Sequence, residues 1–97
     1  SHEYLPLFKM KAYLNLREAR ANGEPVRSGE IGNHRRDIFR LCSLLPPTIR
    51  VELPGALRTD VKEFVEIVEC PPHFMKDIGL AAYAPEEVKE IIIRTYL

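Results

Sequence analysis

Residues 54–68, PGALRTDVKEFVEIV, carry the clearest structural pattern in the sequence. Coiled into a helix, this stretch would place five apolar side chains on one face and four charged side chains on the opposite face. The apolar residues are Leu57, Val61, Phe64, Val65 and Val68, and the charged residues are Asp60, Lys62, Glu63 and Glu66. Proline is favourable in the first turn of a helix, so Pro54 marks the beginning, and residues 71–72, both proline, mark the end. The pattern predicts an amphipathic helix.

Two more helices are expected upstream of this one. The first runs over residues 4–22, ends at Asn22-Gly23, and has a candidate core-facing stripe made of Leu5, Phe8, Ala12, Leu16 and Ala19. The second begins after Ser28, a favourable N-cap residue, and ends at Pro46-Pro47. Its apolar side carries Ile31, Ile38, Leu41, Cys42 and Leu45. The proline residues at the helix boundaries predict that the connections between the helices are short.

A last helix is expected from Pro85 to Tyr96, with Glu86 and Glu87 where the helix dipole favours acids. Residues 91–93, all isoleucine, could instead form a strand, but the sequence offers no convincing partner strand. Residues 73–79 have room for at most one further helical turn. We therefore predict an all-α fold: a small bundle of about four helices with short connections, formed by residues 1–97 as a single domain.

Composition and charge exclude several classes of protein. Fourteen Lys and Arg balance fourteen Asp and Glu, so the chain has no overall field to attract nucleic acid or an anionic membrane. Its apolar runs are far shorter than the roughly 20 residues that cross a bilayer. Cys42 and Cys70 lie on apolar stretches without metal or disulfide spacing, which favours two buried thiols in a reducing compartment. We expect a soluble, cytoplasmic protein without a membrane partner.

Three residues of the first helix do not fit its apolar stripe. Lys9 lies close to the stripe, where its aliphatic stem could cover the core while its amine reaches water. Alternatively, Lys9 points into a shared cleft and holds a phosphate. Met10 and Leu14 lie on the opposite face, which an isolated domain would have to expose. That exposure would suit a missing neighbour or an oligomer contact.

The densest polar cluster is residues 33–40, NHRRDIFR, on the second helix. Arg36 and Arg40 project together, and Asp37 can pair with Arg40 or meet His34. One explanation is a solvated face of surface ion pairs, with His34 as a hydrogen-bonded core histidine. The other is a polar site in which the arginines engage phosphate oxygens and Asp37 acts as a base or metal ligand.

Motifs for complete catalytic centres are absent from the sequence. The three histidines have no HxxxH or Cys/His spacing, so no zinc site is expected within the chain. No GxxxxGK, GxGxxG or GxSxG motif occurs either. We expect no metal site and no cofactor in this fragment, which on its own should be inactive as an enzyme.

Two stretches together resemble a known bacterial family. Residues 9–17, KMKAYLNLR, and residues 31–41, IGNHRRDIFRL, are similar to the C-terminal part of the AbiEii-type nucleotidyltransferase toxin family. In that family, a helix bearing a K-x-x-A pattern precedes a helix bearing R-D-x-x-D/R-L. The resemblance is close over about the first 45 residues and less specific from Val51 onward.

The resemblance implies a two-part nucleotidyltransferase whose helical C-terminal part completes a cleft. It implies that Lys9 and Arg36 bind the nucleotide phosphates and that Asp37 assists catalysis. It also implies that Mg²⁺ and a nucleoside triphosphate are needed by the full-length protein. The partners it implies are the missing N-terminal nucleotidyltransferase domain, a cognate antitoxin, and an RNA acceptor that binds only through the full protein.

The sequence departs from the family pattern in two ways. Arg40 replaces the second acid of the R-D-x-x-D element, which argues against a mechanism that needs a pair of carboxylates on this helix. The chain also lacks the metal-binding D-x-D and the G-S loop, which would lie upstream. The alternative to a nucleotidyltransferase fragment is a non-catalytic helical domain for protein interaction. A third hypothesis, nucleic-acid binding through Arg35, Arg36 and Arg40, is weakened by the neutral overall charge.

Overall fold

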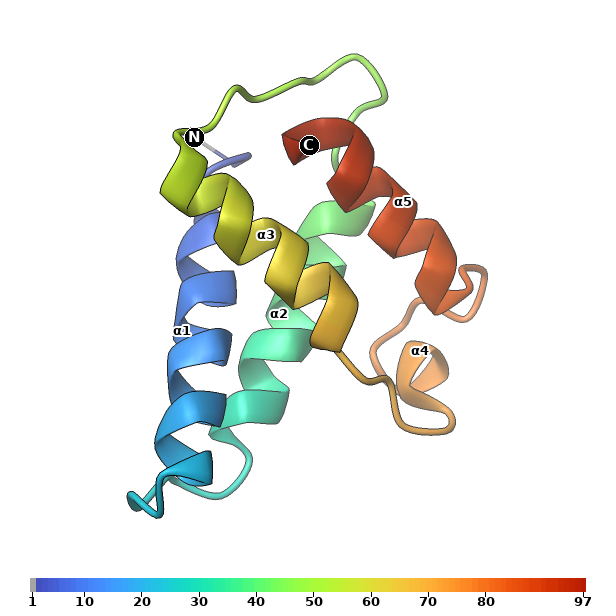
Figure 1. Ribbon diagram of the computed structural model, residues 1–97. Helices are drawn as coiled ribbons and strands as arrows, with labels where there is room; N and C mark the ends of the chain where they lie inside the picture. The colour runs from blue at the N-terminus through green and yellow to red at the C-terminus, as the bar shows by residue number, and fades with distance from the viewer. Residues whose placement is uncertain (1) are drawn as a thin grey trace.

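Figure 1 shows the computed structural model, which describes residues 2–97. Within this range the chain forms five helices and no strand: α1 (Leu5–Ala21), α2 (Glu30–Ser43), α3 (Gly55–Ile67), α4 (Phe74–Asp77) and α5 (Pro85–Tyr96). The predicted all-α class is confirmed, and α4 lies within residues 73–79, where the sequence left room for at most one helical turn. The isoleucines at 91–93 are helical, which rules out the alternative of a strand there.

The first two helices form an antiparallel hairpin that runs the length of the molecule (Figure 1). The predicted N-cap of α2 was wrong: Ser28 does not cap the helix. Gly29 occupies that position in a left-handed conformation, with φ at +80°, and no side chain caps the helix. Glycine adopts this conformation without the steric cost that a Cβ imposes, so here the turn geometry decides where the helix begins.

Helix α3 lies across the hairpin and contacts α1, and α5 packs against both α2 and α3 (Figure 1). Together with α4, these helices enclose one core. The buried apolar residues are Leu7, Met10, Tyr13, Leu14, Ile31, Ile38, Phe39, Cys42, Leu45, Val61, Phe64, Val68, Phe74, Met75, Ile78, Val88, Ile92 and Tyr96. Among residues 2–97, no helix combines the length and the unbroken apolar character needed to cross a bilayer.

The rotation of α1 about its axis differs from the sequence-based prediction. Met10 and Leu14, which we expected on the outer face, lie in the core, and Met10 is 0% exposed. Phe8, predicted to face the core, is 73% exposed, and Leu5 on the same stripe is 43% exposed. The inward face also holds Tyr13, whose ring packs edge-on against Phe64 at a centroid distance of 5.1 Å. Such aromatic pairs add stabilisation beyond their buried area, which favours the observed rotation.

The two ends of the described chain meet at one end of the bundle (Figure 1). The hydroxyl group of Tyr96, in the last turn of α5, donates a hydrogen bond to the backbone carbonyl oxygen of Glu3. Beside it, the backbone amide of Val51 donates to the carbonyl oxygen of Thr95 at 2.8 Å. The connection between α2 and α3, residues 44–54, is longer than the short connections predicted from the sequence, and this hydrogen bond ties it to α5. The start of α1 is fixed to the same helix.

Candidate functional site

Lys9 and Asp37 meet at the exposed edge between α1 and α2. The Lys9 Nζ atom lies 3.2 Å from Asp37 Oδ2, and the two side chains are 25% and 33% exposed. They are brought together because the hairpin is antiparallel: Lys9 follows the first turn of α1, and Asp37 lies in the middle of α2. The structure thus places two residues 28 positions apart in one ion pair that solvent still reaches.

Arg36 is the third member of this cluster. Its Nε atom lies 3.3 Å from Asp37 Oδ1, so each carboxylate oxygen of Asp37 has one cationic partner. The Arg36 side chain is partly exposed. We refer to Lys9, Arg36 and Asp37 as the Lys9 cluster. Two positive charges and one negative charge leave it with a local excess of positive charge.

The surroundings of Asp37 lower its pKa below the ordinary value. Partial burial raises the pKa, but the hydrogen bonds and charges of Lys9 and Arg36 lower it further than burial raises it. Asp37 is therefore ionised at neutral pH. A carboxylate with a lowered pKa is a weak general base. It is better suited to orienting cations than to removing a proton.

The residues around Asp37 do not form a complete site for the magnesium ion that the family resemblance implies. Among residues 2–97, no three His, Cys, Asp or Glu side chains are grouped closely enough to hold a metal ion. Asp37 is one carboxylate, and both of its oxygens already bind cationic side chains. The residues described here therefore do not fit Mg²⁺ by themselves.

The other polar residues of α2 do not join the Lys9 cluster. Arg40 turns away from Asp37, and its Nε donates a hydrogen bond to the carbonyl oxygen of Ile78 at 2.9 Å, which fixes the turn after α4. His34 is half-buried, and its Nδ1 atom has no hydrogen-bond partner among residues 2–97. Neither of the pairings considered for Asp37, with Arg40 or with His34, is formed. The expectation of a hydrogen-bonded core histidine was also wrong at Nδ1.

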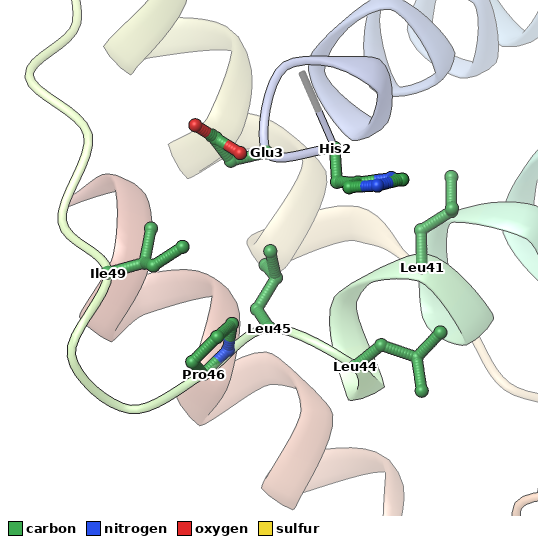
Figure 2. Close-up of a pocket in the computed structure, with 7 residues that line it drawn as sticks. All are labelled: His2, Glu3, Leu41, Leu44, Leu45, Pro46 and Ile49. Carbon is green, nitrogen blue, oxygen red and sulfur yellow. The ribbon is translucent and has the colours of Figure 1, made fainter.

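A separate apolar pocket lies where the end of α2 approaches the start of the chain (Figure 2). Its volume is about 370 Å³, and it is lined by His2, Glu3, Leu41, Leu44, Leu45, Pro46 and Ile49. In Figure 2 the Glu3 carboxylate points away from the His2 ring. Sequence reasoning missed this pocket because its residues come from two segments that are far apart along the chain, residues 2–3 and residues 41–49.

The two cysteines differ in their surroundings. Cys42 is fully buried, as expected, and burial raises its pKa to about 12. Cys70 is only half-buried, which corrects the expectation of two buried thiols. Burial also raises the pKa of Cys70, while the nearby charges of Lys89 and Arg35 lower it in part. Neither thiol has the lowered pKa of a reactive nucleophile.

Comparisons of this chain with protein-family models, with curated proteins and with solved structures find no match. The interpretation of the Lys9 cluster therefore depends on its own geometry and on the resemblance carried by residues 9–17 and 31–41.

Proposed function

We propose that this chain is the C-terminal helical domain of an AbiEii-like nucleotidyltransferase, the toxin of a toxin-antitoxin pair. In this proposal Lys9, Arg36 and Asp37 form one wall of a nucleotide-binding cleft. The observation that carries it is the 3.2 Å contact between Lys9 and Asp37 at an exposed edge. Each of these residues belongs to one of the two stretches that resemble the family.

The chemistry of the Lys9 cluster suits phosphate binding. Lysine and arginine bind phosphate oxygens through charge-assisted hydrogen bonds, and the local excess of positive charge attracts an anion. Asp37 orients Lys9 and Arg36 through its two oxygens. We therefore assign Asp37 as a positioning residue rather than a general base, because its lowered pKa makes it a weak proton acceptor.

The remaining parts of the enzyme belong, in this proposal, to an N-terminal domain outside these 97 residues. That domain would hold Mg²⁺ and the nucleoside triphosphate with its own acids and loop. A cognate antitoxin would be a further partner, and an RNA acceptor would bind only through the full protein. We place the protein in the bacterial cytoplasm, where the free thiols of Cys42 and Cys70 would stay reduced.

The alternative is a non-catalytic helical interaction domain. Its original basis, exposure of Met10 and Leu14, is removed because both residues are buried. Another observation supports it instead: Phe8 is exposed on the outer face of α1, and Leu44 at the end of α2 is 79% exposed. Exposed large apolar side chains are common at surfaces that contact other proteins.

A transfer assay on the intact protein tests the proposal. Labelled nucleoside triphosphates, Mg²⁺ and RNA should give a labelled product, and Lys9→Ala should lower the rate about 100-fold, as expected for loss of a group that stabilises developing charge. Asp37→Ala should lower the rate as well, through misplacement of Lys9. The matched controls are Lys11→Ala and Asp60→Ala, because these residues form a comparable ion pair at 3.3 Å between α1 and α3.

Circular dichroism would establish that each variant remains folded. Full transfer by folded Lys9→Ala and Asp37→Ala would show that the assigned roles are wrong. No transfer with any of the four nucleotides would favour the interaction domain instead.

A further inference from the structure

Three arginines line one pocket at the end of the α1–α2 hairpin where α1 ends and α2 begins. The pocket has a volume of about 390 Å³ and is lined by Arg17, Arg20, Ala21, Ile31 and Arg35. Arg17 and Arg20 come from the last two turns of α1, and Arg35 comes from the second turn of α2. We refer to these three residues as the arginine pocket. No acidic side chain lines it.

Aromatic rings support two of the three guanidinium groups. The Arg17 guanidinium carbon lies 5.7 Å from the centre of the Tyr13 ring, and its Nη1 donates to the Tyr13 hydroxyl at 3.4 Å. The Arg35 guanidinium carbon lies 5.0 Å from the centre of the Phe74 ring. The negative face of an aromatic ring attracts a guanidinium placed over it, and N–H groups of the guanidinium remain available to bind other acceptors. Both groups are thus held in place before any ligand arrives, which lowers the entropy cost of binding.

The positive charge of the arginine pocket is not neutralised by the chain. Within residues 2–97, none of the three arginines forms an ion pair with a carboxylate, although the sequence has as many acids as bases. Arg35 Nη1 donates to a neutral acceptor, the carbonyl oxygen of Glu69, at 3.1 Å. Arg20 is exposed. Like charges repel one another, so a cluster of three unpaired cations favours binding of an anion.

The helix dipole does not explain the whole cluster. A basic residue in the last turn of a helix is stabilised by the partial negative charge there, which accounts for Arg20. Arg35 lies near the opposite end of its own helix, where the dipole offers a cation no such stabilisation. The convergence of all three therefore needs another reason.

We propose that Arg17, Arg20 and Arg35 form a binding site for a phosphate group of a ligand. Guanidinium groups match the geometry of phosphate oxygens, and three of them can surround one phosphate from different sides. The remaining lining residues, Ala21 and Ile31, have no polar side-chain atoms. The site therefore recognises the phosphate group, and its lining offers no polar side-chain contact to the rest of the ligand.

This site is distinct from the Lys9 cluster and does not depend on the proposed nucleotidyltransferase activity. Lys9 and Arg20 are separated by 11 positions on α1, which corresponds to roughly 16 Å along the helix axis. The phosphate could be a terminal group, as in pyrophosphate, or a phosphodiester of a nucleic-acid backbone. These two sources share the same chemistry, and the test separates them.

The test is a titration of the 97-residue chain followed by NMR, which reads the Nε–H groups of individual arginines. One arm uses inorganic pyrophosphate, and the other uses a short single-stranded RNA without terminal phosphates. We expect saturable shifts at Arg17, Arg20 and Arg35 that weaken as salt is raised, because the interaction is between charges. Arg20→Gln should weaken binding about tenfold, as expected for loss of one charge-assisted hydrogen bond.

Arg50→Gln is the matched control. It removes the same charge from an exposed residue in the connection between α2 and α3, at the other end of the hairpin (Figure 1). The Arg50→Gln variant should bind each probe with the same affinity as the unaltered chain. The probe that binds more tightly identifies the source, terminal phosphate or phosphodiester. The proposal is overturned if neither probe gives saturable shifts at these arginines, or if Arg50→Gln weakens binding as much as Arg20→Gln.

Discussion

Replacing Met10 and Phe8 separately by alanine tests which face of α1 is the core. Met10 is 0% exposed, and truncation of a fully buried methionine costs about 2–5 kcal/mol in the free energy of unfolding. Phe8 is 73% exposed. Only about a quarter of the roughly 1.5–3 kcal/mol for complete burial of a phenylalanine is then at stake. That is about 0.4–0.8 kcal/mol, which the better helix propensity of alanine offsets in part.

Urea unfolding followed by helical circular dichroism measures the difference. With a slope of about 2 kcal/mol per molar urea, Met10→Ala should lower the midpoint by about 1 M or more, and Phe8→Ala should barely move it. If Met10→Ala is too unstable to purify, Met10→Leu keeps the volume and should cost under about 1.5 kcal/mol. A Phe8→Ala variant as unstable as Met10→Ala would refute the rotation of α1, and with it the position of Lys9.

Two further predictions concern ionisation and thiol reactivity. The lowered pKa of Asp37 means that its ionised form stabilises the fold: Asp37→Asn should cost under about 1 kcal/mol at pH 7, and this difference should vanish as the pH falls below the ordinary value of 3.8. A difference that persists at pH 2 would contradict it. With a thiol reagent, Cys70 should react in the folded chain, whereas Cys42, whose pKa is raised to about 12, should react only on unfolding. Equal rates for the two thiols would count against this.

The helices that the sequence predicted best have one apolar face and proline at their boundaries. Helix α3 begins after Pro54, and Val61, Phe64 and Val68 of its predicted apolar face are buried. Helix α5 begins at Pro85, as expected. In both segments, helical periodicity and backbone restriction lead to the same structure, so local information was sufficient.

Helix α1 shows why local information was insufficient elsewhere. It has two apolar faces: the stripe that includes Leu5 and Phe8, and the face that includes Met10 and Leu14. Periodicity identifies both faces equally well and cannot choose between them. The choice depends on contacts with other helices, such as the ring of Tyr13 against Phe64. Such a contact joins residues that are distant in sequence, so it cannot be inferred from either helix alone.

The candidate sites were likewise predictable from the sequence only in part. Spacing singled out Lys9 and Asp37 as residues that break their helical patterns, and the resemblance linked them. Their contact also requires the antiparallel hairpin, which the sequence did not specify. The arginine pocket was missed because Arg17 and Arg20 lie on a different helix from Arg35, which the sequence had grouped with Arg36 and Arg40 instead. The ring beneath Arg35, Phe74, belongs to yet another element.

The hydrogen bond between Tyr96 and Glu3 holds the beginning and the end of the described chain together. A polypeptide fused upstream of His2 would begin close to the last turn of α5, which holds Glu3. Lys9 lies four residues after Leu5 on α1, or about 6 Å along the helix axis. A short linker would therefore suffice to hold such a domain near Lys9. A circular permutant that joins residue 97 to residue 2 and opens the chain at residues 23–28 should for the same reason keep the fold.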